Sequence, residues 1–545
     1  MSEATKAVLP LWARWHARRA KLPKPAAWRK RSVRIPMRDG VTLGADIYEP
    51  TVPSKGVLLA VGPYGRGFIY TVGFAWAFVG QGYTVVFAST RGTADSEGEL
   101  DPMRTDARDS HDIVAWLREQ PWYPGRLATV GGSYLGFTQW ALLADAPDDI
   151  AASIVVMGPH DFSRHTWGTG SFRTDLIGWS GGVGGPPESR NPFANLRVQS
   201  AFDKGAAAVI NAVPSLPVAQ EFFRGKRAWM IDRMSRSDLD DPYWAPMQLA
   251  RALETISTPT LIVAGWQDIF LPQSLVQYAR LRERGVDVAL TVGAWVHADI
   301  LLRGGTTIAR ESVQWLDAHL GGAPLARTAA VRAQLSDRKT WLEFPQWPPA
   351  YTTVATWHLH PGGRLDSGEP ATDAAPASFT YDPADPTPTI GGNLIARGGY
   401  VDDSAYAQRS DVLIYHTSPL EGHLTVLGAP VVTLHHSTSL GDADLFVRVS
   451  DVDARGRSTA VCEAYCRVDS TAGVIEIVLN DTAHTFAAGH RIRLMVAGGS
   501  FPQFSRNPGT GENPLSAQTL LPNVHSVSHA GAASTLRMPI DSSAV

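Results

Sequence analysis

Cysteine is scarce in this chain, and so are the structures that cysteines build. Only two, Cys462 and Cys466, occur among 545 residues. Their surroundings alternate like a β-strand, which would hold their Cα atoms roughly 13 Å apart. A disulfide needs Cα atoms within about 7 Å of each other. The sequence therefore predicts no disulfide framework, no cysteine zinc site and a cytoplasmic location.

Long apolar runs and a strong net charge are also missing. No apolar run approaches the ~18 residues of a membrane-spanning helix. The chain has 49 Lys and Arg against 52 Asp and Glu, a formal charge of −3. This balance predicts neither nucleic acid nor a membrane as partner. Residues 1–31 are basic without a cleavable apolar stretch, so we expect a solvated, partly helical extension; contact with a membrane or nucleic acid is the alternative.

Phosphate loops, dinucleotide fingerprints and metal clusters are absent from the sequence as well. The nearest candidates are His160-Asp161 with His165, and the pair His435-His436. Both lack the further ligands that a zinc site requires, so we interpret these side chains as structural. The sequence predicts no metal and no cofactor.

What the chain does contain is a regular alternation of buried strands and helices. Its 44% hydrophobic and 19% charged residues are typical of a globular protein, here of about three domains. Apolar runs alternate with helix-like segments; the runs are 56–61, 83–88, 127–130, 152–157, 259–264 and 286–292. This pattern predicts an α/β fold with a mostly parallel sheet covered on both faces.

Two long segments depart from this alternation. Residues 160–250 are rich in Trp, Gly, Pro and Arg and hold no buried strand, which predicts a helical cap over the carboxyl edge of the sheet. In residues 323–545, alternating strands are separated by Gly, Pro and Asp turns, the pattern of an antiparallel β-sandwich. The α/β domain then comprises residues 32–159 and 251–322.

A serine stands where one predicted strand turns into a helix. The stretch reads Gly131-Gly-Ser133-Tyr-Leu-Gly136, one residue longer than the Gly-x-Ser-x-Gly elbow of serine hydrolases. Glycines on both sides permit a bend too sharp for larger side chains. Such a turn exposes the serine hydroxyl at the edge of the sheet, which makes Ser133 the candidate nucleophile.

An acid and a histidine follow the ends of two later strands. Asp268 comes after the strand at 259–264, and His297 after the strand at 286–292. A histidine can remove the serine proton at neutral pH, and a carboxylate can fix the tautomer of that histidine. Because the carboxyl ends of parallel strands meet at one edge, we expect the three side chains to converge as a Ser133–His297–Asp268 triad.

Two donors for a developing oxyanion are also in view. The Tyr134 N–H begins the helix after the serine, where backbone N–H groups lack intrahelical partners. The loop after the strand at 56–61 contains Tyr64, whose hydroxyl can supply a second hydrogen bond.

Taken together, these motifs resemble the cocaine esterase-like (CocE/NonD) branch of the X-prolyl dipeptidyl-peptidase family of serine hydrolases. The similarity runs from Val33 onward. It rests on Ile35–Gly40, Gly62–Tyr64, Arg91–Gly92 with Ser96–Gly98, Gly131–Gly136, Gly265–Phe270, Trp295–His297, Asp442–Asp444, Gly489–Leu494 and Phe501–Gly511. The resemblance implies an α/β-hydrolase domain with a helical cap, a jelly-roll sandwich that helps to wall the acyl pocket, and the triad and oxyanion hole named above.

One departure from the family bears on the substrate. Relatives that act on α-amino acid esters carry extra carboxylates just after the triad aspartate, to hold an ammonium group. Here that place is Ile269-Phe270-Leu271. The difference favours an apolar or aromatic acyl group, in a pocket built from Phe270 with cap tryptophans such as Trp167 or Trp179.

The predicted function is hydrolysis of carboxylic esters through an acyl-enzyme, with a small ester or short peptide as substrate and a homo-oligomer as a further possibility. An X-Pro dipeptidyl-peptidase or amidase is the alternative, since cap acids such as Asp161 and Asp175 offer carboxylates for a peptide amine. A remoter alternative is an inactive, carbohydrate-binding protein with a hydrolase-like domain.

Overall fold

The first sheet combines a parallel centre with antiparallel edges. The computed structural model describes residues 7–183, 192–469, 473–532 and 534–542. Within them the sheet runs in the order β1-β2-β4-β3-β5-β6-β7-β8-β9-β10. Its strands are β1 (Trp28–Pro36), β2 (Thr42–Pro50), β3 (Val57–Gly62), β4 (Thr84–Ser89), β5 (Leu127–Gly132), β6 (Ile150–Val156), β7 (Thr260–Gln267), β8 (Val288–Val296), β9 (Val331–Gln334) and β10 (Trp341–Phe344). Strands β3 to β9 pair in parallel, so their carboxyl ends share one edge.

Helices cover both faces of this sheet, each over its own buried apolar cluster. One layer contains α4 (Asp106–Arg118), α5 (Tyr134–Leu143), α11 (Ala250–Thr255) and α12 (Leu271–Glu283). The other contains α1 (Leu11–Arg19), α2 (Phe68–Thr71), the π-helix η1 (Val72–Trp76), α3 (Ala77–Val79) and α13 (Gly305–His319). The continuous apolar runs of the sequence are explained by this double covering. In the described part of the chain, no helix has both the length and the apolar character needed to cross a bilayer.

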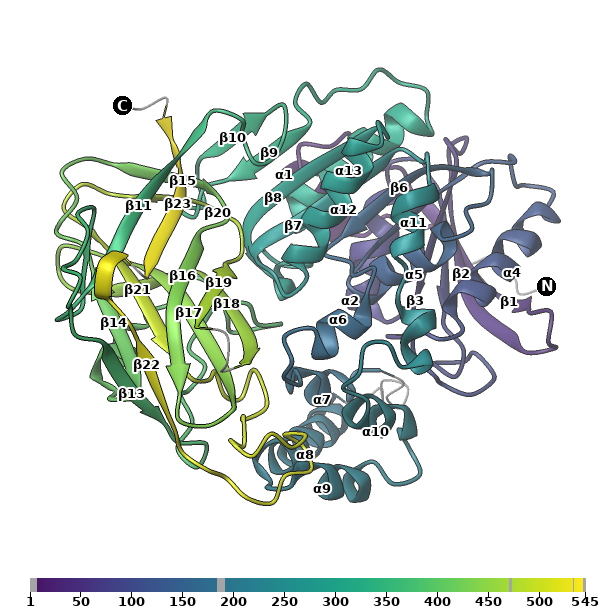
Figure 1. Cartoon of the computed structure of the whole chain (residues 1–545). Helices are drawn as coiled ribbons and strands as arrows, with labels where there is room; N and C mark the ends of the chain where they lie inside the picture. The colour runs from purple at the N-terminus through teal and green to yellow at the C-terminus, as the bar shows by residue number, and fades with distance from the viewer. Residues whose placement is uncertain (1–6, 184–191, 470–472, 533, 543–545) are drawn as a thin grey trace.

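The segment between β6 and β7 is helical, as its composition predicts. It contains α6 (Phe162–Trp167), α7 (Asp175–Trp179), α8 (Pro192–Asn211), α9 (Ser215–Phe222), α10 (Ala228–Ser235) and η2 (Pro242–Met247). Figure 1 shows α7 to α10 as a group at the lower end of the molecule, below the first sheet and next to the second domain. Hydrogen bonds tie this segment to the second domain; two of them are Thr174 N–H to Gln503 O and Leu216 N–H to Leu515 O.

The second domain is all-β. Its longest path of strands runs β13-β22-β16-β23-β11-β12-β14-β21-β17-β18, with β15, β19 and β20 beside it. The bounds are β11 (Thr352–His360), β12 (Arg364–Asp366), β13 (Ala377–Tyr381), β14 (Val412–His416), β15 (Leu424–Gly428), β16 (Val431–Thr438), β17 (Asp442–Val452), β18 (Ser458–Asp469), β19 (Val474–Val478), β20 (Thr482–Phe486), β21 (Arg491–Ala497), β22 (Asn523–Val527) and β23 (Thr535–Asp541). Both cysteines lie in β18 and are free.

Two details differ from the sequence prediction. Strands β9 and β10 lie beyond residue 322 but extend the first sheet, where Val331 pairs with Leu290 of β8. The change to the second architecture therefore comes after Phe344, because β9 pairs with β8 and β10 pairs with β9 before the chain leaves the first sheet. The described part of the basic arm is also less solvated than expected. Trp28 is buried, and helix α1 packs on α3 and α13 through the buried Ala13 and Ala17.

Candidate active site

Ser133 lies on a sharp turn between β5 and α5. Its backbone adopts φ 58° and ψ −124°, a left-handed conformation that is rare for a residue with a side chain. A Cβ atom at Gly131 would lie 2.4 Å from Leu135 Cβ, and one at Gly136 would lie 2.6 Å from Gly158 Cα. The glycines are therefore required by close approach, and helix α5 begins immediately after the serine.

Asp268 and His297 follow β7 and β8, and the structure brings both to Ser133. Nε2 of His297 lies 2.8 Å from Ser133 Oγ, and Nδ1 of His297 lies 2.6 Å from Asp268 Oδ1. The other carboxylate oxygen of Asp268 accepts a hydrogen bond from Phe270 N–H at 2.9 Å. Asp268 is fully buried, so its charge acts on the imidazole with little screening by water. The three residues expected from the sequence form one continuous hydrogen-bonded chain.

The Tyr64 hydroxyl lies next to this chain. It accepts a hydrogen bond from Trp179 Nε1 at 3.0 Å, which occupies a lone pair and leaves the phenol proton free to point elsewhere. Burial raises the pKa of Tyr64 above its usual value, opposed by hydrogen bonds with Trp179 and Ser133, so the hydroxyl stays a donor. On the other side, the Tyr134 N–H is the first of helix α5 and has no intrahelical acceptor.

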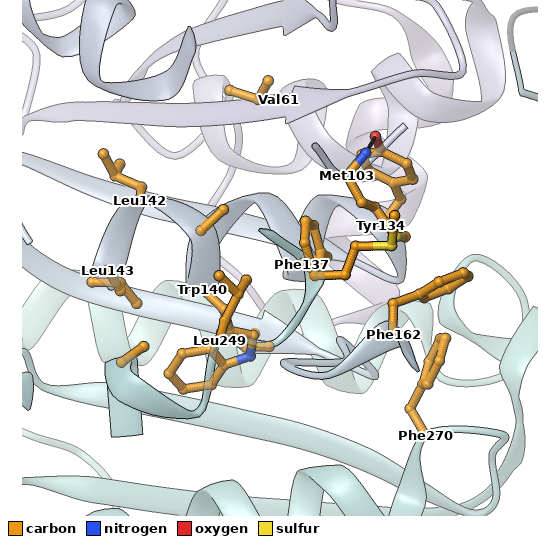
Figure 2. Packing of buried hydrophobic residues seen from close by; sticks show 14 of the residues in the cluster. Val61, Met103, Tyr134, Phe137, Trp140, Leu142, Leu143, Phe162, Leu249 and Phe270 are labelled. Atoms are coloured by element: carbon orange, nitrogen blue, oxygen red, sulfur yellow. Dashed lines mark hydrogen bonds between the residues drawn. The ribbon is translucent and has the colours of Figure 1, made fainter. Parts of the chain in front are cut away.

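An apolar cavity of about 360 Å³ opens beside Ser133 and His297. Phe162, Trp179 and Phe270 are among the aromatic residues that line it, and the ring centroids of Phe162 and Trp179 are 5.6 Å apart. Figure 2 shows Phe162 and Phe270 at the same end of the buried cluster. Two of the predicted pocket residues, Trp179 and Phe270, therefore line this cavity.

Trp167 does not line this cavity, which corrects the third pocket prediction. Its indole N–H donates to Arg233 O at 2.8 Å, and its ring packs on Phe172. The reason is the helical period of α6. Phe162 and His165 are three residues apart and both line the cavity, whereas Trp167 is rotated by roughly 200° from His165 about the helix axis.

The second domain also reaches the site, through a loop that carried no recognisable signal. Ile395 lines the cavity, and its carbonyl accepts a hydrogen bond from Ala298 N–H at 2.9 Å. Asn393 Nδ2 lies 3.4 Å from the backbone oxygen of Asp268. Among the described residues, no group of three or more His, Cys, Asp or Glu side chains is arranged to hold a metal ion.

The sequence did not indicate a role for Asp106, a buried carboxylate that bonds the residue after Ser133. The Tyr134 hydroxyl donates to Asp106 Oδ2 at 2.9 Å and accepts from Met103 N–H at 2.7 Å, and Figure 2 shows Tyr134 beside Met103. This pair holds the residue whose N–H faces the site. Asp106 begins α4, where an acid reads as an ordinary helix-start residue, so nothing in the sequence links it to Tyr134.

Replacing Asp106 with asparagine should change how stability depends on pH. Burial raises the pKa of Asp106 to about 7, against the hydrogen bonds from Tyr134 and Met103 that lower it. Between about pH 4 and pH 7 the folded state then binds more protons than the unfolded state, so this group lowers the free energy of unfolding as pH rises. Urea unfolding across that range should show Asp106→Asn gaining stability relative to the parent protein. A stability difference that stays constant with pH would contradict this.

Comparison with known proteins agrees with the fold. Residues 39–299 match the X-Pro dipeptidyl-peptidase (S15) family, and residues 324–537 match the X-Pro dipeptidyl-peptidase C-terminal non-catalytic domain. The cocaine esterase of Rhodococcus sp. (strain MB1 Bresler) is 32% identical over 541 residues, which cover 88% of this chain and 92% of that protein.

Two solved structures share the whole architecture. An aminopeptidase from a marine sediment Thaumarchaeota archaeon gives a TM-score of 0.81 at 23% identity, and an α-amino acid ester hydrolase gives 0.80 at 22%. Each alignment covers 94% of this chain and 96% of the other. At these identities the likeness establishes the fold.

The fold and these matches define the class of protein, which is a hydrolase with an α/β domain followed by an all-β domain. More narrowly, the chain belongs to the X-Pro dipeptidyl-peptidase (S15) family, in its cocaine esterase-like branch.

Proposed function

We propose that this protein is a serine esterase that hydrolyses carboxylic esters with a neutral, apolar or aromatic acyl group. The observation that carries the proposal is the continuous chain of hydrogen bonds from Asp268 through His297 to Ser133. A serine hydroxyl, an imidazole and a buried carboxylate are arranged in the order that acyl transfer requires.

In the proposed reaction, Ser133 Oγ attacks the ester carbonyl while His297 Nε2 takes its proton. The oxyanion that forms accepts hydrogen bonds from the Tyr64 hydroxyl and the Tyr134 N–H. His297 then returns the proton to the departing alcohol, which leaves an acyl group on Ser133. A water molecule, activated by the same histidine, attacks the acyl-enzyme and releases the acid.

The lining of the cavity supports a neutral acyl group. None of the described residues that line it is Asp or Glu. The cap acids that could hold a peptide amine have other partners. Asp161 accepts from Arg164 N–H and Ser163 Oγ at the start of α6, and Asp175 pairs with Arg173 at 2.8 Å. An ammonium group in this cavity would lose its hydration without gaining a countercharge, which disfavours the X-Pro peptidase alternative.

A fluorophosphonate probe followed by peptide mass spectrometry tests the nucleophile, with labelling expected at Ser133. Rates on p-nitrophenyl benzoate and butyrate, compared with Gly-Pro-p-nitroanilide, test the substrate class. We expect turnover of the esters and little of the anilide. An enzyme that cleaves only the anilide would be a peptidase, and an unlabelled, inactive protein would favour a binding function.

Removing the Tyr64 hydroxyl should lower kcat by about 10²–10³-fold, the usual cost of losing one oxyanion donor. Tyr64→Phe keeps the ring, and the expected loss falls on kcat because the hydrogen bond strengthens only as the oxyanion forms. Tyr123→Phe is the matched control, since that hydroxyl bonds Asp149 away from the site. Equal kcat values for Tyr64→Phe and the parent enzyme would remove Tyr64 from the oxyanion hole.

A further inference from the structure

A second and larger cavity lies directly behind the first. It has a volume of about 730 Å³, twice that of the catalytic cavity. Its walls come from η1, α3 and α13, from Val130 and Val156 on the sheet, and from the N-terminal helix α1. Apolar side chains predominate along these walls, so the cavity favours a hydrocarbon group over a polar ligand.

The two cavities share part of their walls, which we call the partition. Phe74, Ile300 and Leu301 each line both of them. Ile300 and Leu301 belong to the turn that starts with His297, so the partition stands next to the reacting atoms. Leu301 is half-buried and packs on the π-helix, where a Cβ at Gly73 would lie 2.3 Å from Leu301 Cδ2. A change of the Leu301 rotamer would therefore change the shape of the partition, and such changes are fast for side chains with solvent access.

The far end of the large cavity opens at helix α1. Trp15 is 53% exposed there, and the exposed Arg19 of the same helix also lines the cavity. The interior of the cavity is apolar and its rim at α1 carries charge. The interior is therefore suited to a hydrocarbon chain, and the rim to contact with water. The packed N-terminal helix, which the sequence predicts as a solvated arm, thus forms one wall of this space.

We propose that the large cavity holds an aliphatic chain of the ester substrate, which passes from Ser133 across the partition formed by Phe74, Ile300 and Leu301. The inference rests on the proposed esterase function and narrows its substrate class to esters with a medium or long alkyl chain on the acyl or the alcohol side. The catalytic cavity holds the ester group and the first carbons, and further methylenes lose their contact with water beyond the partition.

Two ester series measure this directly, both used below their critical micelle concentrations. p-Nitrophenyl acetate to dodecanoate lengthens the acyl chain, and methyl to decyl benzoate lengthens the alcohol. Burial of a methylene is worth about 0.8 kcal/mol, or roughly fourfold in kcat/KM. We expect kcat/KM to keep rising past the hexyl member in one series, and the series that responds identifies which half of the ester enters.

Variants that fill or open the passage give opposite expectations. Ala309 lies in α13 and lines the large cavity but not the catalytic one. Ala309→Phe should therefore lower kcat/KM for esters with a ten-carbon chain by about 10-fold or more. The value of kcat/KM for p-nitrophenyl acetate should stay within about twofold of the parent value. Leu301→Ala thins the partition and should raise kcat/KM for the long chains. Ala318→Phe, on the same helix but in neither cavity, is the matched control. Circular dichroism and acetate turnover show whether each variant is folded.

The inference is overturned if kcat/KM stops rising at short chains in both series, or if Ala309→Phe lowers kcat/KM for all esters by the same factor. Either result would leave the esterase function intact, because short esters would still be cleaved at Ser133. An enzyme that hydrolyses no ester of any length would overturn the proposed function, and this inference with it.

Discussion

Replacing Ser133 with alanine should abolish ester turnover, with a loss in kcat of about 10⁶-fold, as found when the nucleophile of a serine hydrolase is removed. No other oxygen replaces Oγ at its position 2.8 Å from His297 Nε2, so the covalent route is closed. The substitution removes one atom from a site whose backbone is held by Ser133 N–H to Val156 O and by the first turn of α5. Steady-state rates on p-nitrophenyl butyrate measure the loss.

A matched substitution separates chemistry from stability. Ser153 is buried on the neighbouring strand β6 and hydrogen-bonds Thr129, so Ser153→Ala deletes a comparable buried hydroxyl away from the reacting atoms. That variant should keep kcat within about threefold, since its effect falls on stability. If Ser133→Ala retained one per cent of the parent activity after purification to homogeneity, another group would be the nucleophile.

Replacing Asp268 with asparagine should lower kcat by about 10⁴-fold with little change in the fold. The Asp268 carboxylate accepts a hydrogen bond from His297 Nδ1–H at 2.6 Å, which leaves Nε2 without a proton as the base toward Ser133. An asparagine can present its NH₂ group to Nδ1 instead and so favour the tautomer with the proton on Nε2. The imidazole then cannot accept the serine proton, although its position is unchanged.

The control is another buried carboxylate with no link to the site. Asp411 is buried in the sandwich domain, where it bonds Thr387 and Arg409. Asp411→Asn should affect the melting temperature more than kcat, whereas Asp268→Asn should do the reverse. A crystal structure of Asp268→Asn with the imidazole in place would assign the loss to the tautomer. Loss of activity in proportion to loss of folded protein would assign it to structure.

The α/β domain and the hydrogen-bonded chain were predictable because both follow from local patterns. Buried strands in a parallel sheet are continuously apolar, and a topology with shared carboxyl ends brings Ser133, Asp268 and His297 to one edge wherever the loops are short. The order of these residues along the chain, strand by strand, was sufficient to predict the convergence that the distances then show.

The residues that line the pocket were harder to predict, because they depend on which way a helix faces. Trp167 and Trp179 look alike in the sequence, yet the rotation of α6 directs Trp167 to Arg233 while Trp179 reaches Tyr64. The Asp106–Tyr134 bond joins residues 28 positions apart and has no periodic signature. The orientation of the tryptophans and the Asp106–Tyr134 bond both depend on how the elements pack against one another.

By itself, the sequence determined the alternation of buried strands and helices, the sharp turn at Ser133 and the identity of the three polar residues at the strand ends, because these depend on short-range apolar periodicity and on glycine. Only the tertiary structure decided where β9 and β10 pair, that the described part of the N-terminal arm is packed, and that Phe74, Ile300 and Leu301 stand between two cavities. The physical reason is that cavities and edge pairings arise between elements distant in the chain, where side-chain volume and register act together and no single segment carries the information.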